Sequence, residues 1–463
     1  MNDLSGWIKS MICIFNSKKL ALFLLGLFVS CVAFAAKNTV PTDLELGQDL
    51  QKIREQIYDA KYDIFCNKEF GAIISSPYVG LRAAYDTADL ITDLPTVNAD
   101  IVLLEQKRDI AKYKTAHNLK TPDRPVMALS GALEADAYFW RDFTQGSSSD
   151  IDLGRAELDI LGDINPWVMG ALFLVYDHVR NPTIANSRVY VDSGFVTLGN
   201  LQQSPFYFTI GQIYVPFGQY THYMVSIPLT RVLMRTRERA AVLGYAKDGI
   251  YGTLYGYKGD SYTDNRDSSI NAWGASLGYE WKWRDIDFGA YTYYINNVAD
   301  SEGMQSTDGN FFPGFKTHEK LQHFVPGIGL RGKIKYKPYS FNVEYVGAVR
   351  RFDKTLDLSF NDRGAKPGAL DIEANYDFTF HGFSSSFAVG YGRVWEGLAL
   401  NIPRQSAFMK VATSWFKSTI ESLELREDWN YNRSDNATGA GTNVPVVGAQ
   451  TRYIINAEIG VYF

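Results

Sequence analysis

Two groups of basic residues in this chain recur at every second or fourth position, and this spacing puts side chains on one face of a β-strand. The lysine-rich ladder consists of Arg331, Lys333, Lys335 and Lys337, and the arginine ladder consists of Arg231, Arg235, Arg237 and Arg239. In a membrane strand, a charge facing lipid near the midplane costs about 2–4 kcal/mol, so both ladders are predicted to face a lumen. Basic side chains along a pore attract and orient anions.

The alternative is that carboxylates neutralise both ladders and make them structural. Lys333 would then pair with Glu344 across a tight turn, and Arg239 with carboxylates of the lumen. Carboxylates are stacked at the same two-residue spacing in two other segments, which contain Asp371, Glu373, Asn375 and Asp377, and Glu424, Arg426 and Asp428. The sequence leaves open whether these face the ladders across the lumen or pair locally.

The histidines give little support to metal binding or catalysis. His318 and His323 flank a motif that resembles a zinc-binding helix, but they are five positions apart and do not share a helical face. The remaining histidines show no grouping with serine and aspartate that would suggest a hydrolase, namely His117, His178, His222 and His381. We therefore expect no metal, no cofactor and no enzymatic activity.

The end of the chain shows what kind of element carries the ladders. Apolar or small residues occupy every second position of the last eleven, namely Tyr453, Ile455, Ala457, Ile459, Val461 and Phe463. The opposite face is polar or small, so the apolar face is predicted to meet lipid. A terminal Phe463 after such a strand resembles the assembly signal of bacterial outer-membrane barrels, which makes the barrel assembly machinery an expected partner. The alternative is the last strand of a soluble β-sandwich.

A period of two holds from Val126 to the end and decides between these alternatives. The predicted strands are 126–143, 150–162, 167–180, 187–199, 204–215, 234–246, 249–258, 271–283, 286–297, 326–337, 340–353, 369–381, 383–394, 404–417, 419–433 and 451–463. Tight connections such as 247–249 alternate with long polar ones such as 298–325, as barrels require and sandwiches do not. We predict an all-β, transmembrane antiparallel barrel of about 16 strands in the outer membrane of a Gram-negative bacterium, wide enough for an aqueous channel.

The amino-terminal residues are predicted to direct export. Residues 1–35 combine Lys18 and Lys19 with a short apolar run and read as a signal peptide, for which Met11 is an alternative start. Losing three lysines and one aspartate with this segment changes the formal charge from −5 to −7, which argues against nucleic-acid binding. Cys66 is then the only cysteine left, so no disulfide within the chain is expected.

Two segments separate the signal from the barrel. Residues 36–65 carry an apolar stripe at helical spacing that fits either a short coiled coil or an amphipathic helix at the periplasmic rim. Residues 66–125 include a predicted helix over 98–114 and form either a periplasmic segment or an insert in the lumen. The pattern chooses neither location.

One stretch of the sequence resembles a known family, and this resemblance suggests a function. The stretch Gly199–Tyr245, with the run Gln212-Ile-Tyr-Val-Pro-Phe-Gly-Gln-Tyr220, is similar to the legiobactin-receptor family of outer-membrane siderophore porins. The resemblance implies a porin-like channel that takes up iron as a ferric siderophore. It does not imply which residues bind the siderophore. The alternative is a general or phosphate-type anion-selective porin with no iron role. Outer-membrane lipid and a ferric siderophore or other small anionic solute are the expected partners, and the oligomeric state, a homo-oligomer included, stays open.

One connection within this stretch is predicted to narrow the channel. Pro216 cannot continue a strand ladder and Gly218 permits a turn, so the strand ends there. The loop at 216–233 is long enough to fold inward as a constriction, with Tyr220, His222 and Tyr223 as its candidate lining residues.

Overall fold

The structure is a computed structural model that describes residues 71–74, 97–116, 125–144, 146–177, 188–263, 269–305, 314–315, 319–416, 419–439, 442–446 and 450–462. The predicted signal peptide at 1–35, the helical stripe at 36–65 and the terminal Phe463 lie outside the described residues. All of the described residues belong to one compact unit, Gln56–Phe463.

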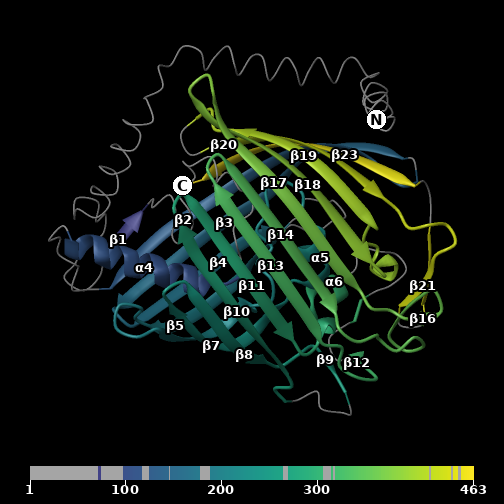
Figure 1. The fold of residues 1–463 in the computed structure, drawn as a ribbon, viewed down its shortest axis with the longest axis horizontal. Coiled ribbons are helices and arrows are strands. Elements are labelled where there is room, and N and C mark those ends of the chain that lie inside the picture. Colours follow the sequence, from purple (N-terminus) through teal and green to yellow (C-terminus); the bar gives the residue numbers. More distant parts are fainter. Residues whose placement is uncertain are drawn as a thin grey trace. The chain divides into compact units, whose positions relative to one another are not determined.

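The chain forms a closed antiparallel β-barrel of sixteen strands (Figure 1). They are β2 (Val126–Arg141), β3 (Ser147–Asn165), β4 (Val168–Asp177), β5 (Arg188–Gly199), β6 (Phe206–Tyr214), β7 (Arg237–Lys247), β8 (Ile250–Tyr257), β10 (Ala272–Trp283), β11 (Ile286–Ile295), β13 (Gly327–Tyr336), β14 (Tyr339–Ala348), β17 (Gly368–Phe380), β18 (Phe383–Trp395), β19 (Gln405–Thr413), β20 (Thr419–Trp429) and β23 (Thr451–Tyr462). Each strand pairs with its neighbour in the chain, and β23 pairs back onto β2 from Ala132↔Tyr462 to Arg141↔Tyr453. The predicted fold is confirmed.

Short turns and long connections lie at opposite ends of the barrel, as predicted. Asp248 and Gly249 connect β7 to β8 with φ angles of 53° and 81°, and His381 and Gly382 connect β17 to β18 with 50° and 85°. Positive φ at both positions is typical of the tight turns that match strand twist. The other end carries the long connections, which include a small sheet of β15 (Leu358–Phe360), β16 (Arg363–Gly364), β21 (Asn436–Gly439) and β22 (Thr442–Pro445).

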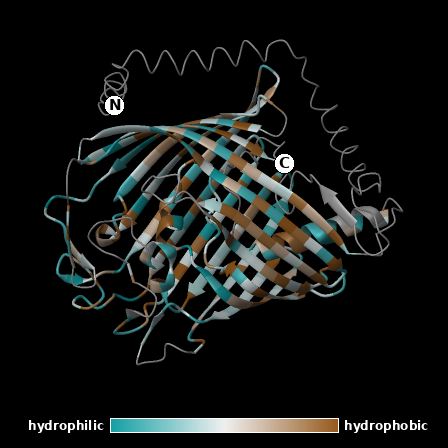
Figure 2. Cartoon of the chain, turned by 180° about the vertical axis from the view of Figure 1, so that it is seen from behind, coloured by the Kyte–Doolittle hydropathy of each residue, from teal (hydrophilic) through white to brown (hydrophobic). Residues whose placement is uncertain are grey.

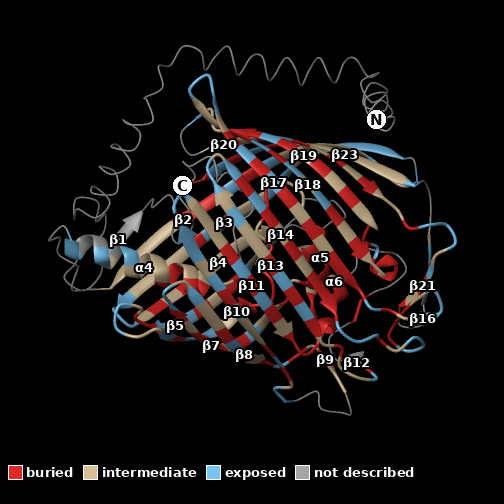
Figure 3. Cartoon of the chain, in the orientation of Figure 1, coloured by how far each residue is buried: buried red, intermediate tan, exposed pale blue. Residues whose placement is uncertain are grey.

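Apolar residues cover the outer face of the strands. On β7, Leu243 is 52% exposed while its neighbour Val242 is fully buried, and β8 and β13 repeat this alternation at Leu254 and Leu330. Figure 2 shows hydrophobic and hydrophilic residues alternating along the strands, and Figure 3 shows the matching alternation in burial. An exposed apolar face on a closed barrel is stable only in lipid.

Exposed aromatic residues gather near the short turns, as they do at a membrane–water interface. They include Trp167, Phe206, Tyr279, Trp281, Trp283, Tyr336, Tyr339, Tyr376 and Phe380. Trp281 stacks on Phe288 with 4.9 Å between ring centroids, and Tyr339 packs on Tyr376 at 5.3 Å. The protein is therefore an outer-membrane barrel of a Gram-negative bacterium. Among the described helices, none has the length and apolar content to cross a bilayer.

Two of the outer connections are tied together by one buried carboxylate. Asp300 ends η4 (Val298–Asp300) and accepts hydrogen bonds from the backbone N–H and hydroxyl of Ser261 at 2.9 and 2.5 Å. Burial raises the pKa of Asp300 to about 6, against these hydrogen bonds, which lower it. Ser261 lies in β9 (Ser261–Tyr262), which pairs with β12 (Glu319–Lys320). The short helix α6 (Glu302–Gln305) follows Asp300 directly.

The segment that precedes the barrel contributes a strand and a helix. β1 (Gly71–Ile74) pairs parallel with Val126–Leu129 of β2, on the stretch that β23 does not reach. The helix α4 (Ala99–Ala116) matches the predicted helix at 98–114, and its amino-terminal half packs on lumen-facing residues of the barrel.

The alternation of connections makes a prediction about topology. A cysteine at Leu356, which is 55% exposed in a long connection, should react with an impermeant maleimide on intact cells. A cysteine at Asp248 in a short turn should react only after the outer membrane is permeabilised. Labelling of both on intact cells would contradict the orientation of the barrel.

Candidate functional site in the barrel lumen

The connection between β6 and β7 leaves the wall and crosses the interior of the barrel. Val215 donates its N–H to the carbonyl of Thr236 at 3.0 Å, which closes the base of this inward loop, defined as residues 215–236. Gly218 then turns with a φ of +84°, and a Cβ there would lie 2.3 Å from the Tyr220 ring. Only glycine meets both conditions without strain. The predicted end of the strand and inward turn are both present.

Carboxylates on the far wall accept hydrogen bonds from the backbone of the inward loop. Glu344 on β14 accepts from the N–H groups of Gln219 and Tyr220 at 2.8 and 2.9 Å. Glu373 on β17 accepts from Tyr223 N–H at 2.9 Å. The loop is therefore held by carboxylate acceptors of the wall in place of a strand partner.

The second half of the loop is held in the same way. Asp371 accepts from the N–H of Thr230 at 2.7 Å, in the first turn of α5 (Leu229–Met234). Glu424 on β20 accepts from Val225 N–H and from the Ser226 hydroxyl, both at 2.5 Å. Hydrogen bonds to charged groups contribute about 1.5–3 kcal/mol each, so together they fix the path of the loop across the lumen.

Cations of the wall hold the loop's carbonyls. Arg331 donates to the carbonyl of Thr221 at 3.3 Å, and Arg426 donates to that of Ile227 at 3.5 Å. At these positions backbone N–H groups bond carboxylates and carbonyls bond guanidinium groups, so the wall supplies partners of the matching polarity. The arrangement satisfies polar groups that would otherwise be buried without partners.

The predicted lining residues of the loop are enclosed by it. Tyr220, His222 and Tyr223 are all buried, at 4%, 1% and 7% exposure. Tyr223 packs with Met224 against Phe408 of the wall, and the other two lie between the loop and the strands it crosses. Of the three, Tyr223 borders a cavity of the lumen, together with Gln219 and Thr221 of the loop.

The lysine-rich ladder faces the lumen in its strand part. Arg331, Lys333 and Lys335 of β13 alternate with the exposed residues Ile328, Leu330 and Ile334. Arg331 pairs with Glu344 at 3.2 Å, and Lys333 pairs with Glu280 of β10 at 2.6 Å. The expected pairing of Lys333 with Glu344 is wrong. In the β13–β14 register Glu344 lies directly opposite Arg331, two residues before Lys333. Lys337 lies in the short turn that follows β13.

Two cavities lie in the lumen next to this ladder. The basic cavity has a volume of about 530 Å³ and is bordered by Arg331, Lys333, Lys335 and Lys282, with Glu280 and Asp287 as its carboxylates. The smaller cavity, about 250 Å³, lies between the ladder and α4, where Glu105 and Ile101 border it. Lys333, Glu280, Gln219, Thr221 and Tyr251 border both cavities, so the two are adjacent.

The arginine ladder is not a ladder in the structure. Arg231 lies in α5, Arg235 follows that helix, and only Arg237 and Arg239 belong to β7. Arg239 is exposed and shares its strand face with Leu243, so the prediction of a common lumen face is wrong. The physical reason is that the inward loop continues to Thr236, which breaks the two-residue period before the strand begins.

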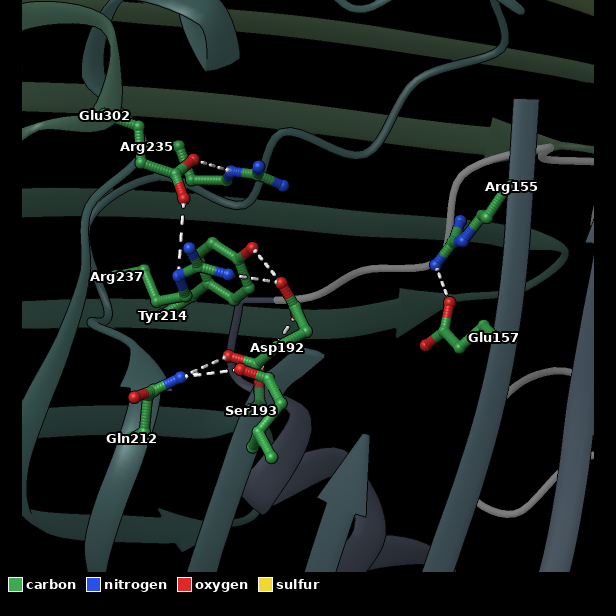
Figure 4. Close-up of polar contacts among 10 residues, drawn as sticks. Arg155, Glu157, Asp192, Ser193, Gln212, Tyr214, Arg235, Arg237 and Glu302 are labelled. Carbon is green, nitrogen blue, oxygen red and sulfur yellow. Dashed lines mark hydrogen bonds and ion pairs between the residues drawn. The ribbon is translucent and has the colours of Figure 1, made fainter. Parts of the chain in front are cut away.

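Arg235 and Arg237 belong instead to a polar network at the base of the inward loop (Figure 4). Arg235 pairs with Glu302 of α6 at 2.7 Å and lies over the Tyr214 ring at 4.4 Å. Arg237 bonds Asp192 at 2.7 Å, and Tyr214 donates to the same carboxylate oxygen at 2.8 Å. Both guanidinium charges are thus matched by carboxylates.

The helix α4 occupies another part of the lumen. Its residues Ile101, Leu103 and Leu104 are buried in one cluster with Tyr207 and Phe195 of the wall. Sequence reasoning predicted the helix but left its location open, because its apolar face suits either a lumen wall or another helix. The role of the stacked carboxylates Asp371, Glu373 and Glu424 in holding the backbone of the inward loop was not predicted. Their two-residue spacing indicates which strand face they occupy, but not which groups they bond.

The contacts of Glu373 and Glu424 predict a loosened loop when both are removed. Changing both to alanine should cost the inward loop about 3 kcal/mol or more, because three hydrogen bonds to these two carboxylates are lost. Single-channel recordings should show a larger and noisier conductance. Glu427→Ala is the matched control, since it lies on β20 with its side chain on the other face, and it should record like the unmodified protein. An unchanged trace for the double variant would refute the anchoring role.

Comparison with known proteins finds relatives that align with most of this chain. The chain is 35% identical over 407 residues to a UPF0422 protein of Coxiella burnetii, an alignment that covers 86% of this chain and 85% of that protein. It is 35% identical over 411 residues to a UPF0422 protein of Legionella pneumophila, covering 84% of this chain and 76% of the relative. No family model matches the chain.

Solved structures with a similar course are outer-membrane proteins of low sequence identity. The outer membrane channel DcaP of Acinetobacter baumannii is 12% identical, with a TM-score of 0.49 over 74% of this chain and 99% of that one. An anion-selective porin from Comamonas acidovorans is 10% identical, also with a TM-score of 0.49, over 73% of this chain and all of that one.

Proposed function

This chain belongs to the UPF0422 family, and we propose that it is a porin-like channel that takes up iron as a ferric siderophore. The observation that carries the proposal is the basic cavity beside the inward loop. Four cations and two carboxylates border it, so its lining is net positive. Its volume falls within the range of about 300–1,000 Å³ that is usual for small-molecule sites.

The chemistry of this cavity suits an anionic chelate. Ferric complexes of carboxylate siderophores carry negative charge, and their outer oxygens accept hydrogen bonds from ammonium and guanidinium groups. Lys335 borders the cavity and forms no ion pair among the described residues, while Lys333 lies between both cavities. The similarity of Gly199–Tyr245 to siderophore porins supports the same assignment.

A second function is consistent with the same cavity. A general or phosphate-type anion-selective porin would also place cations along a narrowed lumen. The two functions differ in what the cell loses without the protein. We expect a deletion strain to grow normally in rich medium and to fail on a ferric carboxylate siderophore as the sole iron source. Normal growth on that source, together with impaired phosphate uptake, would favour the second function.

The charge of the basic cavity can be tested directly. Changing Lys333 and Lys335 to glutamine makes the cavity lining formally neutral, so the reversal potential of the reconstituted channel should move toward cation selectivity. The shift should be largest at low salt, because salt screens the field. Uptake of ferric citrate into liposomes should slow by about tenfold, equivalent to 1.4 kcal/mol.

The matched control is Arg239→Gln, which removes a cation from the exposed face of β7. It should leave both the reversal potential and the uptake rate unchanged. If the Lys333 and Lys335 double variant behaves like this control, the basic cavity does not set the channel's charge preference.

A further inference from the structure

The position of α4 raises the question of how a solute leaves the basic cavity. The helix borders the smaller cavity with Ile101, Val102 and Glu105, and Asn98 borders it just before the helix begins. That cavity shares Lys333 and Glu280 with the basic one. Just before the helix, Val97 forms a parallel bridge with Tyr214 at the end of β6. The helix therefore runs from within the lumen toward the short-turn end, which faces the periplasm.

The contacts at that end place α4 across part of the exit. Lys107 bonds the Asp163 carboxylate at 2.5 Å and the Asn165 carbonyl at 2.6 Å, at the turn between β3 and β4. Tyr251, the second residue of β8, donates to Glu105 at 3.1 Å. The helix thus spans from the β3–β4 turn to β8, which lies four strands beyond β4 in the barrel order.

The wall is shaped to receive this helix. A Cβ at Gly199 would lie 3.3 Å from Leu104 Cδ1 and 2.7 Å from Tyr207 Cβ, so the glycine leaves room for the helix to approach. The apolar contact is small, however, and consists mainly of Ile101, Leu103 and Leu104. Burying these three side chains stabilises the seated helix, and the cost of ordering the helix offsets part of that stability.

One buried carboxylate on α4 makes its seating less stable. Asp100 is 5% exposed, and its Oδ2 atom has no hydrogen-bond partner among the described residues. Glu105 is held in the same cavity as Glu280. A buried carboxylate oxygen without a donor is costly, so the seated helix gives up part of the stability that its apolar face provides.

We propose that α4 is a displaceable plug that closes the periplasmic exit of the basic cavity, and that an anionic solute leaves the channel only when the helix moves aside. The proposal rests on the proposed function in so far as a solute crosses the barrel, and it does not require that the solute contain iron. The inward loop, held by four carboxylates, stays in place while α4 moves.

A reversible crosslink tests this. Lys107→Cys and Asp163→Cys, in a chain whose own three cysteines are replaced by serine, are bridged with a cleavable bismaleimide in the reconstituted barrel. We expect the bridge to abolish uptake of ferric citrate and reduction of the crosslinker to restore it. Each single-cysteine variant treated alike should transport at least as fast as the unmodified barrel, because it cannot be bridged and has lost the Lys107–Asp163 ion pair. Ferric citrate uptake at an equal rate with and without the bridge would overturn the proposal.

A second variant covers the opposite state. Replacing residues 99–116 with a glycine–serine linker of equal length should raise the single-channel conductance in KCl at least twofold and speed liposome swelling in a neutral sugar. Heat-modifiable mobility on gels checks that the barrel has folded. An unchanged conductance would overturn the plug. If the unmodified barrel passes sugar but no ferric citrate, the siderophore function fails, and the sugar measurement with and without the bridge still decides the role of α4.

Discussion

The interior of this barrel depends on hydrogen bonds between lumen carboxylates and the backbone of a loop that has no strand partner. A loop inside a barrel brings N–H groups into a space where water does not satisfy all of them, and each unsatisfied group is costly. Glu344, Asp371, Glu373 and Glu424 supply acceptors on three different strands. Each carboxylate accepts hydrogen bonds from the loop, so these four residues hold the segment that narrows the lumen.

This use of the carboxylates determines where positive charge remains. Arg331 is taken up by Glu344 and the loop, and the network around Asp192 and Glu302 takes up Arg235 and Arg237. Lys335 forms no ion pair among the described residues, and it borders one cavity with Lys333 and Lys282, which pair with Glu280 and Asp287. The positive charge is therefore localised on one side of the lumen next to the loop, and the pore is not uniformly charged.

The barrel could be predicted from the sequence because lipid on one face of each strand and water on the other impose a period of two. This period does not depend on which strands are neighbours. Leu330 and Arg331 show their opposite faces from spacing alone. The period fails where a strand has not begun: Arg235 precedes β7, and its spacing to Arg237 follows the strand pattern by coincidence. Partners between distant strands were equally hidden, since Lys333 reaches Glu280 across β11.

The two structures that fill the lumen differ in how they are held, and this difference bears on which one can move. The inward loop is tied by charge-assisted bonds to β14, β17 and β20 and is continuous with the wall at both ends. The helix α4 is held by a short apolar face, the Lys107–Asp163 ion pair and two hydrogen bonds, one to the Asn165 carbonyl and one from Tyr251, and it carries Asp100 into the lumen. Displacing the helix therefore breaks fewer bonds than displacing the loop. The loop and the basic cavity can then select the solute unchanged while movement of α4 controls its release into the periplasm.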